Sequence, residues 1–125
     1  ISNLNFYDKP LILIDDYGHH PVEISATIQA IRQKFPREKI CMIFEPHRFT
    51  RTKQLFNDFV KVLSQVDSLL LLDIYPANEK PIKGISSKKI ISEIAKSHKN
   101  AEYIGKSDPL VWLQSNYENF SILIT

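Results

Sequence analysis

The stretch SLLLLDIY, residues 68–75, decides the fold class of this chain. Four consecutive leucines that end at an aspartate are typical of a strand buried on both faces, as in a parallel sheet. Residues 11–14 (LILI) and 40–44 (ICMIF) are two further aliphatic runs of the same kind. We therefore expect three core strands that are buried on both faces, rather than strands with one solvated face.

The segments between these runs carry helical signals. Apolar residues at steps of three and four predict a helix over residues 22–35, ended by Pro36, and an apolar helical stripe over residues 55–63. The remaining expected elements are a helix capped by Ser86, a short strand at 103–104, a helix with Asp108 as N-cap and proline next, and a last strand at 120–124. Alternation of this kind predicts one α/β domain over residues 1–125, a Rossmann-like three-layer fold with a mostly parallel sheet of about five or six strands.

Composition limits the classes of protein to which the chain can belong. Of its 125 residues, 43% are hydrophobic and 24% charged, as in ordinary globular domains, and the net charge of +2 is too small to indicate a nucleic-acid partner. No apolar run approaches the ~20 residues that a membrane helix needs. The single cysteine, Cys41, excludes an internal disulfide, and we expect it to be buried in a cytoplasmic protein. The chain lacks an initiator methionine and stops within an apolar stretch, so we expect it to be a piece of a longer protein.

The sequence lacks the usual phosphate-binding and nucleophile motifs. It contains only three glycines, so neither a GxxxxGK[ST] phosphate loop nor a GxGxxG dinucleotide fingerprint can be written, and no GxSxG elbow is present. An enzyme that uses a nucleotide would need its phosphate-binding site elsewhere.

Polar residues gather directly after each of the three core strands. These segments are residues 15–21 (DDYGHHP), 45–52 (EPHRFTRT) and 73–79 (DIYPANE). Ligands of open α/β sheets bind beyond the carboxyl ends of the strands, so we expect the three segments to meet there and to form the functional site.

The carboxylates and imidazoles of the first two segments allow two interpretations. Carboxylates and imidazoles are acceptable ligands for zinc or a two-metal centre, and the candidates are Asp15, Asp16, His19, His20, Glu45 and His47. Adjacent residues in a loop point in different directions, however. The alternative is that one aspartate and one histidine cap the following helix, while the others are solvated.

The second segment indicates an anion site. If a helix begins near residue 49, its amides and positive dipole end face the site, and Arg48 and Arg51, three residues apart, can reach the same anion. Guanidinium groups bind carboxylate or phosphate in a bidentate manner. Nucleic-acid binding is a rival use, but no broad basic stripe is present. Two solvated arginines are the other alternative, although cations are unfavourable at a helix start, which favours an anion ligand.

At the same three segments the sequence resembles the Mur ligases, and among them the alanine-adding members. The strings are IDDYGHHPVEI (residues 14–24), FEPHRFTRT (44–52) and DIYPANEKPIKGISS (73–87), in family order and spread over nearly the whole chain. Two positions depart from the family pattern. Glu45 replaces a customary glutamine, and Asn78 stands where glycine is usual, although asparagine tolerates a left-handed backbone.

The resemblance implies that the chain is the C-terminal domain of an ATP-dependent ligase of peptidoglycan synthesis. Such an enzyme joins L-alanine to UDP-N-acetylmuramate through an acyl phosphate. An N-terminal domain would hold the UDP-sugar, and a central domain would carry the phosphate loop and most ligands of Mg²⁺. This chain would contact both domains, with no nucleic-acid or membrane partner, and would be inactive alone.

The resemblance also implies roles for single residues. Asp16 and Tyr17 would bind the nucleotide, with Asp16 accepting hydrogen bonds from the ribose of ATP. His19, Arg48 and Arg51 are the catalytic candidates. Both arginines would hold the amino-acid carboxylate, with His19 and His47 also binding substrate, and no metal ligand is expected in the chain. Asp15 and His20 are better candidates for shaping the loop.

Two rival functions stay open at the level of the residues. One is a free-standing metal-dependent hydrolase that uses the aspartate, histidine and glutamate cluster. The other is a non-catalytic module that binds a nucleotide or a carboxylate.

Overall fold

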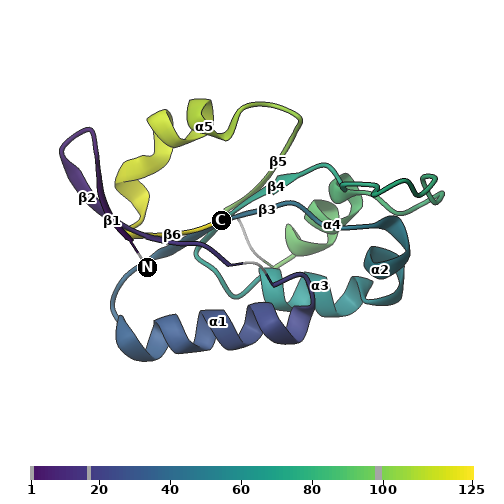
Figure 1. The fold of residues 1–125 in the computed structure, drawn as a ribbon, viewed down its shortest axis with the longest axis horizontal. Helices are drawn as coiled ribbons and strands as arrows, with labels where there is room; N and C mark the ends of the chain where they lie inside the picture. Colours follow the sequence, from purple (N-terminus) through teal and green to yellow (C-terminus); the bar gives the residue numbers. More distant parts are fainter. Residues whose placement is uncertain (1, 17, 98–99) are drawn as a thin grey trace.

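The protein forms a single six-stranded sheet with helices on both faces (Figure 1). The computed structural model describes residues 2–16, 18–97 and 100–125. Along the chain the elements are β1 (Ser2–Phe6), β2 (Lys9–Ile14), α1 (Pro21–Lys34), β3 (Ile40–Phe44), α2 (Phe49–Gln54), α3 (Phe56–Leu63), β4 (Ser68–Leu72), α4 (Ser87–Ile94), β5 (Ala101–Gly105), α5 (Pro109–Asn116), the short 3₁₀ helix η1 (Tyr117–Asn119) and β6 (Ile122–Ile124). The expected three-layer α/β fold is confirmed.

Five of the six strands are parallel. The strand order is β1-β2-β6-β3-β4-β5, and only β1 runs antiparallel, as the edge partner of β2. The last strand of the chain, β6, thus lies between β2 and β3, in the middle of the sheet. All five parallel strands consequently point their carboxyl ends to one edge.

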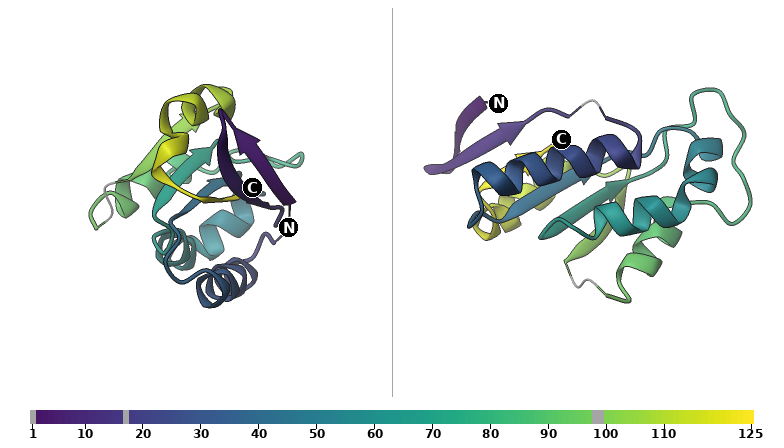
Figure 2. Two further views of the ribbon diagram at one scale, coloured as in Figure 1. Left: turned by 90° about the vertical axis from the view of Figure 1, so that its left-hand side faces the viewer. Right: turned by 90° about the horizontal axis from the view of Figure 1, so that it is seen from below.

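The sheet separates two apolar clusters. The larger cluster lies between the sheet and the helices α1, α3 and α4. These helices contribute Ile24, Phe59 and Ile90, respectively, which are almost fully buried. The smaller lies under α5 and includes Leu113 and Phe120. Figure 2 shows the same arrangement end-on, with α5 on one side of the sheet and the other helices opposite. Burial of this apolar surface on both faces is the main stabilising contribution to the fold.

Several element boundaries differ from those expected. The N-terminal strand β1 was not predicted. It pairs with β2 through a two-residue turn, Tyr7 and Asp8, both at positive φ. The strand expected over residues 68–75 ends at Leu72, where the pairing with β5 is irregular. The strand at 103–104 is longer than expected, at five residues, and the last strand is shorter, at three.

The predicted helix caps hold. The side chain of Ser86 accepts a hydrogen bond from the amide of Lys89. The side chain of Asp108, the residue before Pro109, accepts one from the amide of Leu110. Cys41 is fully buried, and this burial raises the pKa of its thiol to about 12, as expected of a cysteine with a packing role. Within the described residues no helix is long and apolar enough to cross a membrane.

Candidate functional site

The three polar segments come together at the carboxyl edge of the sheet. The amide of Asp16 donates to the carbonyl of Thr125, directly after β6, with a length of 3.0 Å. His47 forms a parallel bridge with Tyr75, and the amide of Arg48 donates to the carbonyl of Tyr75 at 2.8 Å. In Figure 1, α2 and the long loop between β4 and α4 extend together beyond this end of the sheet. Backbone hydrogen bonds therefore join the second segment to the third and the first to the end of β6.

A cavity of about 270 Å³ opens between the first two segments and the ends of the neighbouring strands. The carboxylate of Asp16 is one of its polar walls. Its Oδ1 accepts a hydrogen bond from the amide of Gly18 at 2.9 Å, while its Oδ2 is buried and has no hydrogen-bond partner among the described residues. A side chain at Gly18 would lie 3.0 Å from Asp16 Oδ1 and from Glu23 Cβ, so glycine permits this tight turn. The lining residues are Asp16, Gly18, His19, Met42, Ile43, Phe44, Glu45, His47, Leu72 and Thr125.

Two imidazoles that line this cavity contact one another, with their ring planes tilted by 34°. The ring centroids of His19 and His47 are 4.2 Å apart, and the ring of Tyr75 lies 5.0 Å from that of His47. Partial burial, followed by the charges of His47 and Arg51, lowers the pKa of His19 below its usual value. His47 Nδ1 is buried and also has no partner in the described part of the chain. The ring of His47 thus has unused hydrogen-bonding capacity at the site. Tyr17, the second candidate for nucleotide binding, lies outside the described residues.

The two arginines follow the cavity residue His47 in the sequence but do not line the cavity, and the charge of Arg51 acts on His19. Arg48 is the N-cap of α2, with φ at +73°, and Arg51 lies one turn on within the helix. Neither guanidinium has an ion pair or a hydrogen bond among the residues described by the structure. Two cationic groups beside the cavity are therefore available to an anion.

The helix start itself is not available, contrary to expectation. The carboxylate of Glu79 accepts hydrogen bonds from the amide of Thr50, at 3.1 Å, and from its hydroxyl, at 2.6 Å. An anionic ligand therefore does not meet a free first turn of α2. Moreover, α2 has only six residues, so Arg51 also belongs to its last turn, and the argument from an unfavourable helix dipole does not hold.

The adjacent aspartate and histidine pairs are split between the cavity and local structure. His20 caps α1, with its Nδ1 accepting from Val22, while Glu23 accepts from the amide of His20 and completes a capping box. Asp15 accepts a hydrogen bond from the hydroxyl of Thr125. One histidine of the segment is a cap, as the structural alternative expected, but neither aspartate caps the helix. Among the described residues no three histidine, cysteine or acidic side chains are close enough together to hold a metal ion.

Sequence analysis assigned no role to two residues that shape the site. They are Glu79, which holds the start of α2, and Thr52, which is completely buried and donates through its hydroxyl to the carbonyl of Arg48 at 2.8 Å. The family-like string 73–87 contains Glu79, but its partner Thr50 lies 29 positions earlier, in the first turn of α2, and no local pattern reveals that contact.

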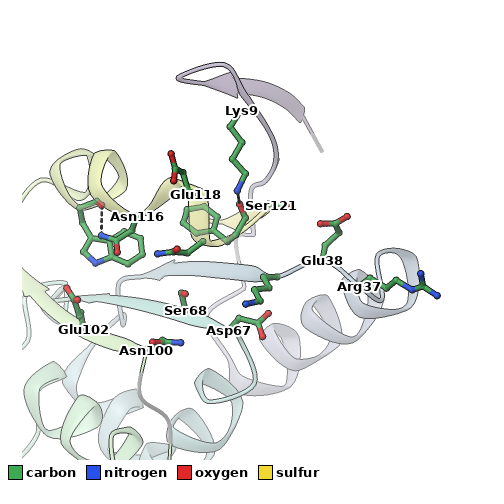
Figure 3. A pocket seen from close by; sticks show the side chains of 14 residues that line it. Lys9, Arg37, Glu38, Asp67, Ser68, Asn100, Glu102, Asn116, Glu118 and Ser121 are labelled. Carbon is green, nitrogen blue, oxygen red and sulfur yellow. Dashed lines mark hydrogen bonds between the residues drawn. The ribbon is translucent and has the colours of Figure 1, made fainter.

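A larger cavity, of about 750 Å³, lies at the opposite edge of the sheet. Figure 3 shows its wall, with Lys9 reaching from the β1–β2 hairpin and Glu118 from η1. Lys9 Nζ donates to the carbonyls of Tyr117 and Phe120, at 3.0 and 2.6 Å, so this cation is used within the fold. The cavity contains none of the residues of the three polar segments. Size alone does not make it the functional site, and the carboxyl edge remains the candidate.

Comparison with known proteins agrees with the resemblance at these segments. The family model of the Mur ligase, glutamate ligase domain, matches residues 4–118. A UDP-N-acetylmuramate–L-alanine ligase of Psychrobacter arcticus is 55% identical over 93 residues, which are 74% of this chain and 19% of that protein. The same enzyme of Psychrobacter cryohalolentis gives the same identity and shares. The chain thus spans about a fifth of the length of these relatives.

Solved structures show the same fold. The UDP-N-acetylmuramate-alanine ligase of Thermotoga maritima superposes with a TM-score of 0.64 at 23% identity, over 97% of this chain and 24% of that one. A folylpolyglutamate synthase of the same organism gives 0.61 at 16% identity, over 99% and 26%. Neither a free-standing hydrolase nor a non-catalytic module is favoured by these matches. Because the family model spans almost all of the sequence, the chain belongs to the Mur ligase family, as a glutamate ligase domain.

Proposed function

We propose that this chain is the C-terminal domain of a three-domain, ATP-dependent ligase of peptidoglycan synthesis. The enzyme would join L-alanine to UDP-N-acetylmuramate in the cytoplasm. One observation carries the proposal. A carboxylate oxygen that is buried and has no partner among the described residues belongs to the cavity at the carboxyl edge of the sheet, and two arginines without an ion pair follow the cavity residue His47. The identity of 55% to alanine ligases supports the choice of amino acid.

Asp16 would serve the nucleotide end of the site. A buried carboxylate oxygen without a donor is unfavourable, and a ribose hydroxyl would supply the missing hydrogen bond to Oδ2. Tyr17 would be the second contact to the nucleotide. We assign Mg²⁺ mainly to the central domain, where the resemblance to Mur ligases puts it.

Arg48 and Arg51 would serve the amino-acid end. Alanine offers only a methyl group, an amine and a carboxylate, and the amine must stay free to attack. Orientation must therefore come largely from the carboxylate, for which a planar guanidinium fixes both position and angle. Catalysis would consist mainly of such positioning and of charge neutralisation.

The two histidines would act between these ends. ATP supplies the phosphoryl group that activates the muramyl carboxylate as an acyl phosphate. The lowered pKa of His19 favours its neutral imidazole, which does not repel the ammonium form of alanine. His47, in ring contact with His19, would hold that imidazole in place.

The test is the kinetics of Arg48→Ala and Arg51→Ala in the full-length ligase. Loss of either guanidinium should remove ~2–4 kcal/mol of transition-state stabilisation, roughly a thirty- to thousand-fold loss in kcat/KM for L-alanine. The apparent affinity for ATP should change much less, and lysine should rescue only partly. Lys53→Ala, which removes an exposed cation of the same helix, is the matched control.

Three outcomes separate the alternatives. If the arginine variants keep their alanine kinetics and bind ATP more weakly, the arginines are phosphate ligands. If neither parameter changes, they are solvated surface residues. If Lys53→Ala has the same effect as the arginine variants, general loss of positive charge is the cause, and the carboxylate assignment is wrong.

A further inference from the structure

The segment that carries both arginines is fixed from a neighbouring loop. Glu79, in the loop after β4, uses one carboxylate oxygen for the amide of Thr50 and the other for its hydroxyl. The side chain of Arg48, at the N-cap position, makes no capping hydrogen bond of its own. Glu79 therefore supplies from outside the helix the cap that α2 lacks.

The backbone of Arg48 is held at every hydrogen-bonding group. Its amide donates to Tyr75, and its carbonyl accepts from the amide of Thr52 at 3.2 Å and from the Thr52 hydroxyl at 2.8 Å. Such a network is what keeps a non-glycine residue at a φ of +73°. The guanidinium has no part in it. The structure thus fixes the base of the Arg48 side chain and leaves its charged end free.

The negative charge of Glu79 lies near Arg48 but does not form an ion pair with its guanidinium. Its carboxylate is attracted by Arg48, and hydrogen bonds from Thr50 are the main cause that lowers the pKa of Glu79. Yet Arg48 and Glu79 form no ion pair. An ion pair would have blocked the guanidinium for an external carboxylate.

We propose that Glu79 is a positioning residue for the amino-acid substrate, which fixes the turn from Arg48 to Arg51 through Thr50. The proposal rests on the proposed function of these arginines as a carboxylate clamp. The proposal predicts that Glu79 affects the affinity for the amino-acid substrate without contacting that substrate.

The experiment measures Glu79→Ala and Glu79→Gln in the full-length ligase. Glu79→Ala should raise the KM for L-alanine about ten-fold, as expected for loss of hydrogen bonds to a charged acceptor, while kcat and the KM for ATP change less than about two-fold. Glutamine keeps one acceptor oxygen, so Glu79→Gln should lie between the wild type and Glu79→Ala. Asp58→Asn removes an exposed carboxylate on α3, outside the site, and should have no effect.

A double-mutant comparison separates positioning from general stability. If Glu79 acts through the arginines, Glu79→Ala should add nothing to the KM for alanine in an Arg48→Ala, Arg51→Ala background. If Glu79→Ala raises the KM for alanine ten-fold both in the wild type and in the double arginine variant, the proposal is overturned. If Glu79→Ala does not fold, Thr50→Val, which removes only the hydroxyl bond, and Thr50→Ser, which retains it, take its place, and equal KM values for these two would overturn the proposal as well.

Failure of this proposal is distinguishable from failure of the proposed function. If the arginine variants raise the KM for alanine and Glu79→Ala does not, only the positioning role is wrong. If none of these variants changes that KM, the carboxylate clamp is wrong and Glu79 has nothing to position.

Discussion

At the scale of the residue, the site combines groups whose chemistry is left unused by the fold. Asp16 Oδ2 and His47 Nδ1 are buried without a partner among the described residues, although buried polar atoms are normally satisfied. His20 and Asp15, one position from residues of the cavity, instead accept hydrogen bonds in a helix cap and from the hydroxyl of Thr125. Engagement in local hydrogen bonds thus distinguishes the members of each adjacent pair.

The titration of His19 gives a prediction at this scale. Its pKa is lowered in the native protein, chiefly by burial and then by His47 and Arg51, while Glu23 and Asp16 oppose the shift. Around and below pH 6.5, a larger fraction of His19 is therefore protonated in the unfolded chain than in the native state. The stability contributed by neutral His19 is present above pH 6.5 and is lost as the pH falls through the folded pKa.

NMR titration of the His19 ring should give a midpoint below 6.5. In His47→Asn the midpoint should rise, but not fully, because burial remains. In His19→Asn the free energy of unfolding should fall less steeply below pH 6.5 than in the wild type. A wild-type midpoint at or above 6.5 would contradict the arrangement of cations around this ring.

At the scale of the element, α2 shows how a short helix is placed by its surroundings. It begins at a residue with positive φ, has no cap of its own and is only six residues long. Isolated helices of this length are unstable in water, so α2 depends on its contacts with the loop after β4. The conformational strain at the start of α2 lies at Arg48, because this residue has a positive φ.

Glycine substitution should separate the two arginines of this element. A positive φ costs an ordinary residue roughly 1–3 kcal/mol, whereas glycine adopts it freely at an entropic cost of roughly 0.5–1 kcal/mol. Arg48→Gly should therefore raise the free energy of unfolding of the 125-residue chain by about 1 kcal/mol. Arg51→Gly, inside the helix, should lower it by about 1 kcal/mol. Urea unfolding of both variants measures the difference, and two equal losses would refute the strain at Arg48.

Element by element, the sequence predicted what depends on local pattern. Aliphatic runs identified the central strands, and the signals at Ser86, Asp108 and Pro109 identified two helix starts correctly. The strand β1 was missed because its turn consists of Tyr7 and Asp8, which take positive φ without the glycine or asparagine that normally marks a hairpin.

The location of the site was also predicted from the sequence. The rule for parallel sheets brought three distant segments to one edge, because it depends only on strand direction. It could not reveal that Glu79 occupies the start of α2, because that contact joins a loop to a helix start 29 positions earlier in the sequence. Asn78, which replaces a customary glycine, does adopt positive φ, as expected of asparagine.

At the scale of the whole molecule, the chain has a complete core and an incomplete site. Both faces of the sheet are covered, by α1, α3 and α4 on one side and α5 on the other, and 24 hydrophobic side chains are buried among the residues that the structure describes. The site offers an acceptor and two cations, but the sequence contains no phosphate loop. Folding and catalysis should consequently separate in this chain.

The 125-residue chain should therefore unfold cooperatively yet catalyse nothing by itself. Supplied with ATP, Mg²⁺, UDP-N-acetylmuramate and L-alanine, it should release no ADP above a buffer control, because no group in the sequence cradles the phosphates. Elemental analysis should find no stoichiometric transition metal. The Arg48→Ala variant of the same chain reveals contamination, since activity of a host ligase would persist in it unchanged. ADP release that is present in the chain and absent from the variant would instead show a complete active site here, and the assignment of phosphate binding to a central domain would be wrong.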